Sequence, residues 1–260
     1  MKIKDVIEAL ERFAPLPLQE EYDNAGLQTG LTEAEVSGAL LCLDVTEEVL
    51  REAAAQGLNM VIAHHPLLFR PLRHLTDGTQ VERCVRYAVR HDIAVYAAHT
   101  NLDNARGGVN YEMGRRIGLE DLQLLQERSD GQGGSGVVGR LGRPMEAGDF
   151  LKHIKRTFRV ECLQHNRLLD GRPIRKVALC GGAGDFLLPW ALEAGADAFL
   201  TGEMNYHRFF GWEGRIQIGV LGHYQSEQFT QQLLQKLLED CLPALRTRIT
   251  TINTNPIHYL

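Results

Sequence analysis

The chain has few cysteines, and their spacing does not suggest that they act in pairs. Five occur among 260 residues, an odd number, and no two of them form a Cys-x-x-Cys motif. This usage argues against a disulfide framework and against a zinc ribbon. We expect reduced, mostly buried thiols in the cytosol.

Long apolar runs and an excess of positive charge are also absent. No run approaches the ~18 apolar residues that span a bilayer, and residues 1–13 mix charged with apolar side chains, unlike a signal peptide. The formal net charge is −5 and the basic residues are dispersed, which does not favour nucleic acid as a partner. We expect a soluble, cytoplasmic protein without a membrane partner. With 44% hydrophobic residues, the chain can build one large or two modest domains.

What the chain does have is metal-binding side chains at the ends of apolar runs. The run 61–63 is followed by His64 and His65, and then by Pro66, which cannot continue a central strand. Adjacent residues of a regular strand face opposite ways, but a loop removes that restriction. Each histidine could therefore reach a different ion in one cleft.

Two further apolar runs end in a shared spacing, His99 to Asp103 and His223 to Glu227. If a helix follows each run, residues four apart lie about 6 Å from one another along one helix face. The offset between the two pairs is constant, since 223 − 99 = 227 − 103 = 124. We interpret this as an internal echo.

Imidazoles and carboxylates are ligands that suit divalent cations without redox chemistry. The candidate metal ligands are His64, His65, Asp103, His223 and Glu227. Five exceed the need of one four-coordinate ion with an open position, so we predict two divalent ions. Zinc, iron, manganese, cobalt and nickel all accept such ligands. A single histidine at a strand end is more often a hydrogen-bonded residue, but that interpretation would have to hold at several positions independently.

A second echo lies upstream. Aligning residues 39–42 with residues 177–180 places His64-His65 on Gly202-Glu203, since 180 − 42 = 202 − 64 = 138. Both stretches are typical of strand, turn, helix, turn and strand. They predict an α/β fold with two related α/β lobes and a dinuclear metal cleft. The alternative is that any two such units with small residues before the second strand would align as well.

A glycine-rich stretch at residues 128–136 marks an exposed loop or a lobe boundary. We therefore place an N-terminal α/β lobe at residues 1–127 and a C-terminal α/β lobe at residues 128–260. The boundary is approximate, and the C-terminal helix could pack back on the first lobe.

Several residues near these strand ends have open roles. His99 could orient a metal ligand, donate a proton or simply pack, and Glu203 could polarise a bound water or cap a turn. We take these two as the catalytic candidates. Asp44 has the same ambiguity as Glu203. The glycines of residues 181–184 could present N–H groups to a phosphate, but a tight strand-to-helix turn is favoured because the spacing of a nucleotide-binding motif is missing.

Six motifs in order resemble the signatures of the Nif3-like dinuclear-metal family, whose bacterial members are often labelled GTP cyclohydrolase 1 type 2 homologues. They are Tyr22-Asp23-Asn24-Ala25-Gly26-Leu27-Gln28, Cys42-Leu43-Asp44-Val45-Thr46, His64-His65-Pro66, His99-Thr100-Asn101-Leu102-Asp103, Thr201-Gly202-Glu203 and Gly222-His223-Tyr224-Gln225-Ser226-Glu227. The resemblance covers essentially the whole chain. Tyr22 stands where tryptophan is expected, and a mid-chain insert that some members carry is missing.

This resemblance implies that the five candidate ligands hold two divalent ions, bridged by carboxylate oxygens or water. It also implies a two-lobed α/β protomer and a toroidal homohexamer with the metal sites facing an internal cavity. The activity expected from it is that of a metal-dependent hydrolase that acts on a purine nucleotide, with His99 or Glu203 as proton carrier. The alternative is a non-catalytic metal-binding ring that acts as a metal buffer, an assembly platform or a nucleic-acid-associated factor.

Overall fold

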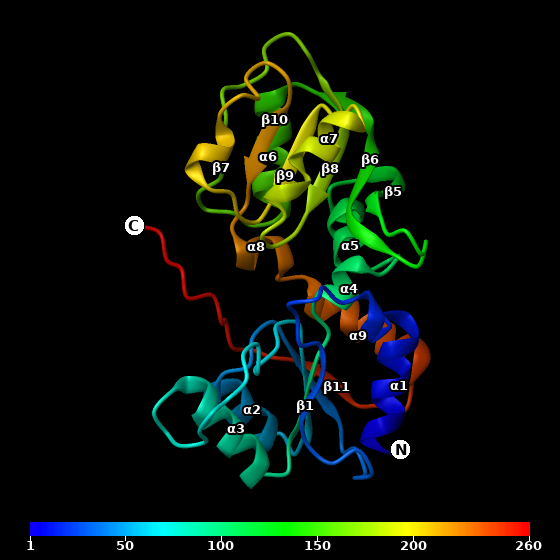
Figure 1. Cartoon of the computed structure of the whole chain (residues 1–260), viewed down its shortest axis with the longest axis vertical. Coiled ribbons are helices and arrows are strands. Elements are labelled where there is room, and N and C mark those ends of the chain that lie inside the picture. The colour runs from blue at the N-terminus through cyan, green and yellow to red at the C-terminus, as the bar shows by residue number, and fades with distance from the viewer. The chain divides into compact units, whose positions relative to one another are not determined.

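The computed structural model describes residues 1–260, and the chain divides into two compact units. The first unit comprises Met1–Leu102 and Thr230–Pro256, and the second comprises Asp103–Phe229 and Ile257–Leu260 (Figure 1). Each unit has its own β-sheet with helices, which confirms the predicted α/β fold. None of the helices is long and apolar enough to cross a membrane.

The first unit contains a five-stranded sheet in the order β1-β4-β3-β2-β11. Its strands are β1 (Gly26–Thr29), β2 (Ala39–Cys42), β3 (Met60–Ala63), β4 (Ala94–Ala97) and β11 (Thr247–Ile249), and its helices are α1 (Ile3–Phe13), the 3₁₀ turn η1 (Leu16–Leu18), α2 (Glu47–Ala55), α3 (Gln80–Arg90) and α9 (Thr230–Cys241). Every residue of β2, β3 and β4 is buried, as expected for parallel strands covered on both faces. Figure 1 shows α2 and α3 on one side of this sheet and α1 and α9 on the other.

The second unit contains a six-stranded sheet in the order β5-β6-β8-β9-β10-β7. Its strands are β5 (Leu119–Glu127), β6 (Gly134–Met145), β7 (Gln164–His165), β8 (Ile174–Cys180), β9 (Ala198–Thr201) and β10 (Gln217–Val220), and its helices are α5 (Val109–Arg116), α6 (Ala147–Thr157), η2 (Asp185–Leu187), α7 (Leu188–Glu193), η3 (Tyr206–Phe209) and α8 (His223–Glu227). The short helix α4 (Thr100–Asn104) carries the chain from the first unit into the second. One core packs α5 and α6 against the sheet, and another packs α7 against it.

The internal echo corresponds to a repeated strand topology. The order β1-β4-β3-β2 of the first sheet recurs as β7-β10-β9-β8 in the second, and β1 and β7 are both antiparallel edge strands. Cys42 pairs with Ala63 in the first sheet and Cys180 with Thr201 in the second. Both partners keep the predicted offset, since 180 − 42 = 201 − 63 = 138. The shared topology supports related lobes over a chance alignment.

The units differ from the division at residues 127 and 128 that we expected from composition. That position lies inside a hairpin of the second unit, because Glu127 of β5 pairs with Gly134 of β6. The glycine-rich stretch is therefore a hairpin turn, and the crossing into the second unit comes near Leu102. After Phe229 the chain returns to the first unit, where α9 contacts α1 and β2.

Candidate metal centre

Three histidines meet at one edge of the first sheet. His64 and His65 follow β3, and His99 follows β4. The two strands are parallel, with Ala63 in register with Ala97, so their carboxyl ends open at the same edge. The ring centroids lie 5.0 Å apart for His64 and His65, 5.4 Å for His64 and His99, and 5.5 Å for His65 and His99.

Two of these rings are oriented by acceptors at Nδ1. His64 donates from Nδ1 to the carbonyl oxygen of Ala98 at 2.7 Å, and His65 donates from Nδ1 to Oδ1 of Asp44 at 2.7 Å. A neutral imidazole that donates from Nδ1 carries its lone pair on Nε2. Thr254 donates to the second oxygen of Asp44 at 2.6 Å. This arrangement resembles the carboxylate–histidine pairs that orient metal ligands in proteins.

Asp44 is ionised in this setting. Burial raises the pKa of its carboxyl, but hydrogen bonds from His65 and Thr254 lower the pKa below its usual value. The sequence left the role of Asp44 ambiguous. The structure places it against His65, where its negative charge makes the imidazole a stronger electron donor.

His99 is held in the same way by Asp23. Its Nδ1 donates to Oδ1 of Asp23 at 2.7 Å, and Thr100 donates to the other oxygen from its backbone N–H at 3.1 Å and from its hydroxyl. The side chain of Asp23 is 0% exposed. Burial raises its pKa, but the hydrogen bonds from His99, Thr100 and Asn24 lower the pKa to about 2. Sequence reasoning did not assign a role to Asp23. The only signal was a carboxylate inside a polar turn motif.

In the second unit, the candidate ligand His223 lies close to two carboxylates. His223 and Glu227 both lie on α8, and Nε2 of His223 lies 3.2 Å from Oε2 of Glu227. The four-residue spacing therefore brings the two side chains together as predicted. Nδ1 of His223 lies 3.0 Å from Oε1 of Glu203, which follows β9. Glu203 thus takes, relative to His223, the place that Asp44 takes relative to His65.

Glu227 lies in a close-fitting cradle of glycines. Its carboxylate is buried, with only 4% of the residue exposed, and Gly182 passes directly beside it. A Cβ atom on Gly182 would lie 2.5 Å from Oε1 of Glu227, which is closer than real Cβ contacts. Gly182 also has φ of +57°, a conformation that favours glycine. The close approach of Gly182 and its glycine-specific backbone conformation therefore restrict the position of the Glu227 carboxylate.

The glycine turn that precedes α7 is structural. Its N–H groups donate to side chains of the second unit rather than pointing into open space. The pairs are Gly181 with Asn110 at 2.9 Å, Gly182 with Ser226 at 3.0 Å and Gly184 with Thr201 at 3.1 Å. A phosphate would have to displace all three. The tight-turn interpretation, which the sequence favoured, therefore agrees with the structure.

Asp103 lies on α4, at the beginning of the second unit, and is partly buried. Its carbonyl oxygen accepts a hydrogen bond from Nδ2 of Asn110 at 3.1 Å. His64, His65 and Glu227 each offer one ligand atom of the kind that a divalent ion binds. Two imidazoles and a carboxylate form a donor set that fits a metal ion. The ligand roles of Asp103 and His223 stay predictions.

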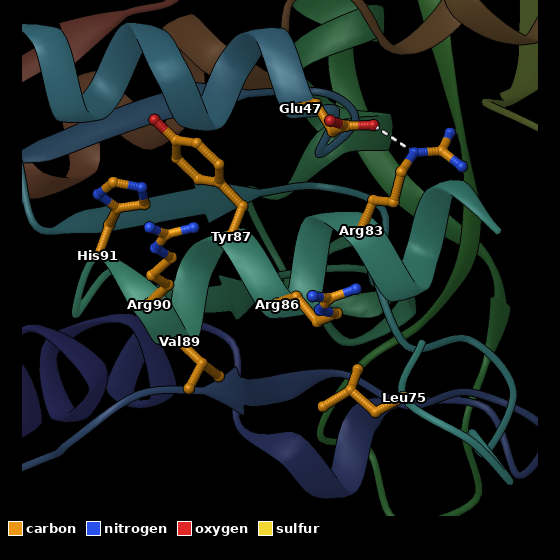
Figure 2. A pocket seen from close by; sticks show the side chains of 8 residues that line it. All are labelled: Glu47, Leu75, Arg83, Arg86, Tyr87, Val89, Arg90 and His91. Carbon is orange, nitrogen blue, oxygen red and sulfur yellow. Dashed lines mark hydrogen bonds and ion pairs between the residues drawn. The ribbon is translucent and has the colours of Figure 1, made fainter. Parts of the chain in front are cut away.

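A separate groove of about 430 Å³ lies along α3 of the first unit (Figure 2). Its lining residues are Glu47, Leu75, Arg83, Arg86, Tyr87, Val89, Arg90 and His91. None of the predicted site residues is among them. Nε of Arg83 donates to Oε1 of Glu47 at 2.6 Å, and both side chains line the groove (Figure 2).

Comparisons with known proteins agree with the fold and identify the family. The family described as Duf34/NIF3 (NGG1p interacting factor 3) matches residues 1–256. A Lactococcus lactis protein named GTP cyclohydrolase 1 type 2 homolog is 36% identical over 241 residues, 91% of each chain. One with the same name from Streptococcus pneumoniae is 30% identical over 272 residues, 100% of each chain.

Solved structures show the same architecture. Staphylococcus aureus hypothetical protein SA1388 superposes with a TM-score of 0.92 at 26% identity, covering 100% of this chain and 99% of that one. A Bacillus cereus protein related to NIF3 gives a TM-score of 0.89 at 24% identity with the same coverage. The match over nearly the whole sequence confirms the resemblance, and the chain belongs to the Duf34/NIF3 family.

Proposed function

We propose that the protein is a hydrolase that depends on two divalent metal ions, held by His64, His65, Asp103, His223 and Glu227. The observation that carries this proposal is the orientation of the histidines. Nδ1 of His65 faces Asp44 and Nδ1 of His223 faces Glu203, which leaves Nε2 of each ring as the candidate metal-binding atom.

The five proposed ligands come from both units of the chain. When bound, two such ions would activate a water molecule and stabilise negative charge that develops on the substrate. Asp44 and Glu203 hold the histidines against rotation. The metal identity is open among zinc, iron, manganese, cobalt and nickel, because all accept imidazole and carboxylate ligands.

His99 is the residue we assign to proton transfer. Asp23 accepts from its Nδ1 and carries a negative charge, because the pKa of Asp23 is about 2. With Asp23 at Nδ1, Nε2 of His99 is the ring atom that would exchange a proton with the substrate. Glu203 was our other candidate for this role. Its contact with His223 supports a positioning role instead.

The substrate class we propose is a purine nucleotide. The relatives from Lactococcus lactis and Streptococcus pneumoniae are named as homologues of a GTP cyclohydrolase, and the proposed ions would bind the phosphates of GTP.

The test offers metal-replete protein GTP and other nucleoside triphosphates and follows product formation by chromatography. Asp103→Ala and His223→Ala should each lower turnover by about a hundredfold or more, because each removes a ligand. Glu48→Ala, an exposed carboxylate on α2, is the matched control and should retain activity. Turnover that persists unchanged in both ligand variants would point to a contaminant and contradict the proposal. Tight metal binding without turnover of any nucleotide would favour the non-catalytic metal-binding ring.

We also propose that the protein assembles as a toroidal homohexamer, as its family resemblance implies. Sedimentation equilibrium tests this with the full chain. A mass of one or two protomers at micromolar concentration would contradict it.

A further inference from the structure

One turn of the first unit is tied by hydrogen bonds to both strand ends that carry the histidines. Asp23 of this turn accepts from His99, after β4. Asn24 donates from Nδ2 to the carbonyl oxygen of Leu68 at 2.7 Å, and the N–H of Leu68 donates to Oε1 of Gln28 at 3.0 Å. Leu68 belongs to the loop that follows β3. The turn therefore fixes the position of that loop beside the histidines.

The two segments joined in this way each carry an exposed aromatic ring. Tyr22 is 67% exposed and Phe69 is 44% exposed. Their ring centroids lie 6.4 Å apart at an interplanar angle of 63°, and the ring of Phe69 lies 6.1 Å from that of His99. The aromatic pair is therefore contiguous with the histidine cluster, on the side of His99.

We propose that Tyr22 and Phe69 bind the planar heteroaromatic base of a nucleotide whose anionic end reaches the histidine cluster. A planar ring that stacks on these two side chains would remove their exposed apolar surface from water, which is favourable. A nucleobase suits them because every base has a π-face that stacks on aromatic side chains. The hydrogen bonds of Asn24 and Gln28 position the rings before the ligand arrives, which lowers the entropic cost of binding.

This inference rests on the proposed function in one respect: the proposed metal ions would bind the anionic end of the ligand. The binding of the base depends on Tyr22 and Phe69 and requires no turnover. A second copy of this chain that covers the two rings is the competing occupant.

The experiment compares two probes on metal-loaded full-length protein by titration calorimetry. GTP carries a base, and inorganic tripolyphosphate carries a chain of three phosphates without one. The wild-type protein should bind GTP about tenfold or more tighter than tripolyphosphate. Tyr22→Leu or Phe69→Leu should lower that preference by about tenfold while the affinity for tripolyphosphate stays unchanged. Tyr22→Phe keeps the ring and should retain the preference.

Tyr87→Leu is the control. Tyr87 stacks on His91 with ring centroids 4.1 Å apart, near the end of α3 (Figure 2). That end of α3 leads into the amino end of β4, whereas His99 follows its carboxyl end. The variant removes an aromatic ring of the same unit and should leave the preference for GTP unchanged.

Equal affinities of the wild-type protein for the two probes, including no measurable binding of either, would overturn the inference. An unchanged preference in both leucine variants would also overturn it, and a loss of dimer or higher assembly in these variants without a change in preference would assign the rings to a second copy. Failure of the proposed function is separate. If GTP stays intact on prolonged incubation while the ring-dependent preference is present, the hydrolase assignment falls and the base-binding site stands.

Discussion

Nδ1 of His65 lies 2.7 Å from Oδ1 of Asp44, and Thr254 holds the other oxygen of that carboxylate at 2.6 Å. These contacts fix both the tautomer and the orientation of a proposed metal ligand. They join two strand ends and the C-terminal segment of the first unit. The lowered pKa of Asp44 keeps its carboxylate charged beside the imidazole, which suits a residue that orients a metal ligand.

Asp44→Asn should weaken metal binding about 10- to 100-fold, because the neutral amide supports the imidazole less and can hold it in the wrong tautomer. Competition with a fluorescent chelator measures this directly. Asp77→Asn changes an exposed aspartate in the loop between β3 and α3 and should leave the affinity unchanged. Equal weakening in both variants would mean that general charge, rather than the contact with His65, is responsible.

Asp23 should make the metal-free protein sensitive to acid. Its pKa is lowered from 3.8 to about 2 on folding, so its stabilising contribution is fully present above about pH 4 and is lost as the pH falls through 2. The difference corresponds to about 2 kcal/mol in the free energy of unfolding. Urea unfolding at several pH values between 2 and 6 measures it.

Asp23→Asn should be less stable than the wild type at pH 6, and the gap should close as the pH approaches 2. Asp130→Asn, in the exposed β5–β6 turn, is the control and should follow the wild-type profile. Parallel profiles for Asp23→Asn and the wild type would contradict this assignment.

Gly182→Ala should displace the carboxylate of Glu227, because the new Cβ would lie 2.5 Å from Oε1. Gly195→Ala is a matched control in the same unit, since Gly195 has φ of +68° and no atom within 4 Å of an added Cβ. Both variants lose about 1 kcal/mol of stability to the left-handed backbone. Only Gly182→Ala should lose a further ~1–3 kcal/mol and bind metal more weakly. Identical behaviour of the two variants would show that the cradle has no such role.

Glu203→Gln should lower metal affinity, because Glu203 orients His223 through Nδ1. We expect a loss of about tenfold, since Glu203 is exposed and water weakens the interaction. If Glu203 instead carried a proton, its replacement would lower turnover and leave metal affinity unchanged. Metal titration and steady-state kinetics on one preparation separate the two outcomes.

The strand ends that carry the site could be predicted from the sequence, because a local signal marks them. Pro66 marks the end of the strand that contains the apolar run 61–63. The four-residue spacing from His223 to Glu227 places their side chains 3.2 Å apart on α8. The offset of 138 also predicted which strand positions correspond, down to the pairing of Cys42 and Cys180 with their neighbours.

The partners of the histidines could not be predicted in this way. Asp23 and His99 are 76 residues apart, and their contact depends on how the polar turn folds against β4. No periodicity records such a contact. The division at residues 127 and 128 rested on a glycine-rich stretch that forms a hairpin turn. The return of α9 to the first unit, which the sequence analysis allowed for, is decided by tertiary packing.

The number of ions bound per chain tests the central claim most directly. Protein purified without added metal, and protein saturated with zinc, iron or manganese and then desalted, should contain two ions per chain by elemental analysis. His65→Ala and Glu227→Ala should each lower that number, while His74→Ala, an exposed histidine outside the cluster, should not. One ion or fewer per chain in every saturated sample, or full occupancy in both ligand variants, would contradict the account.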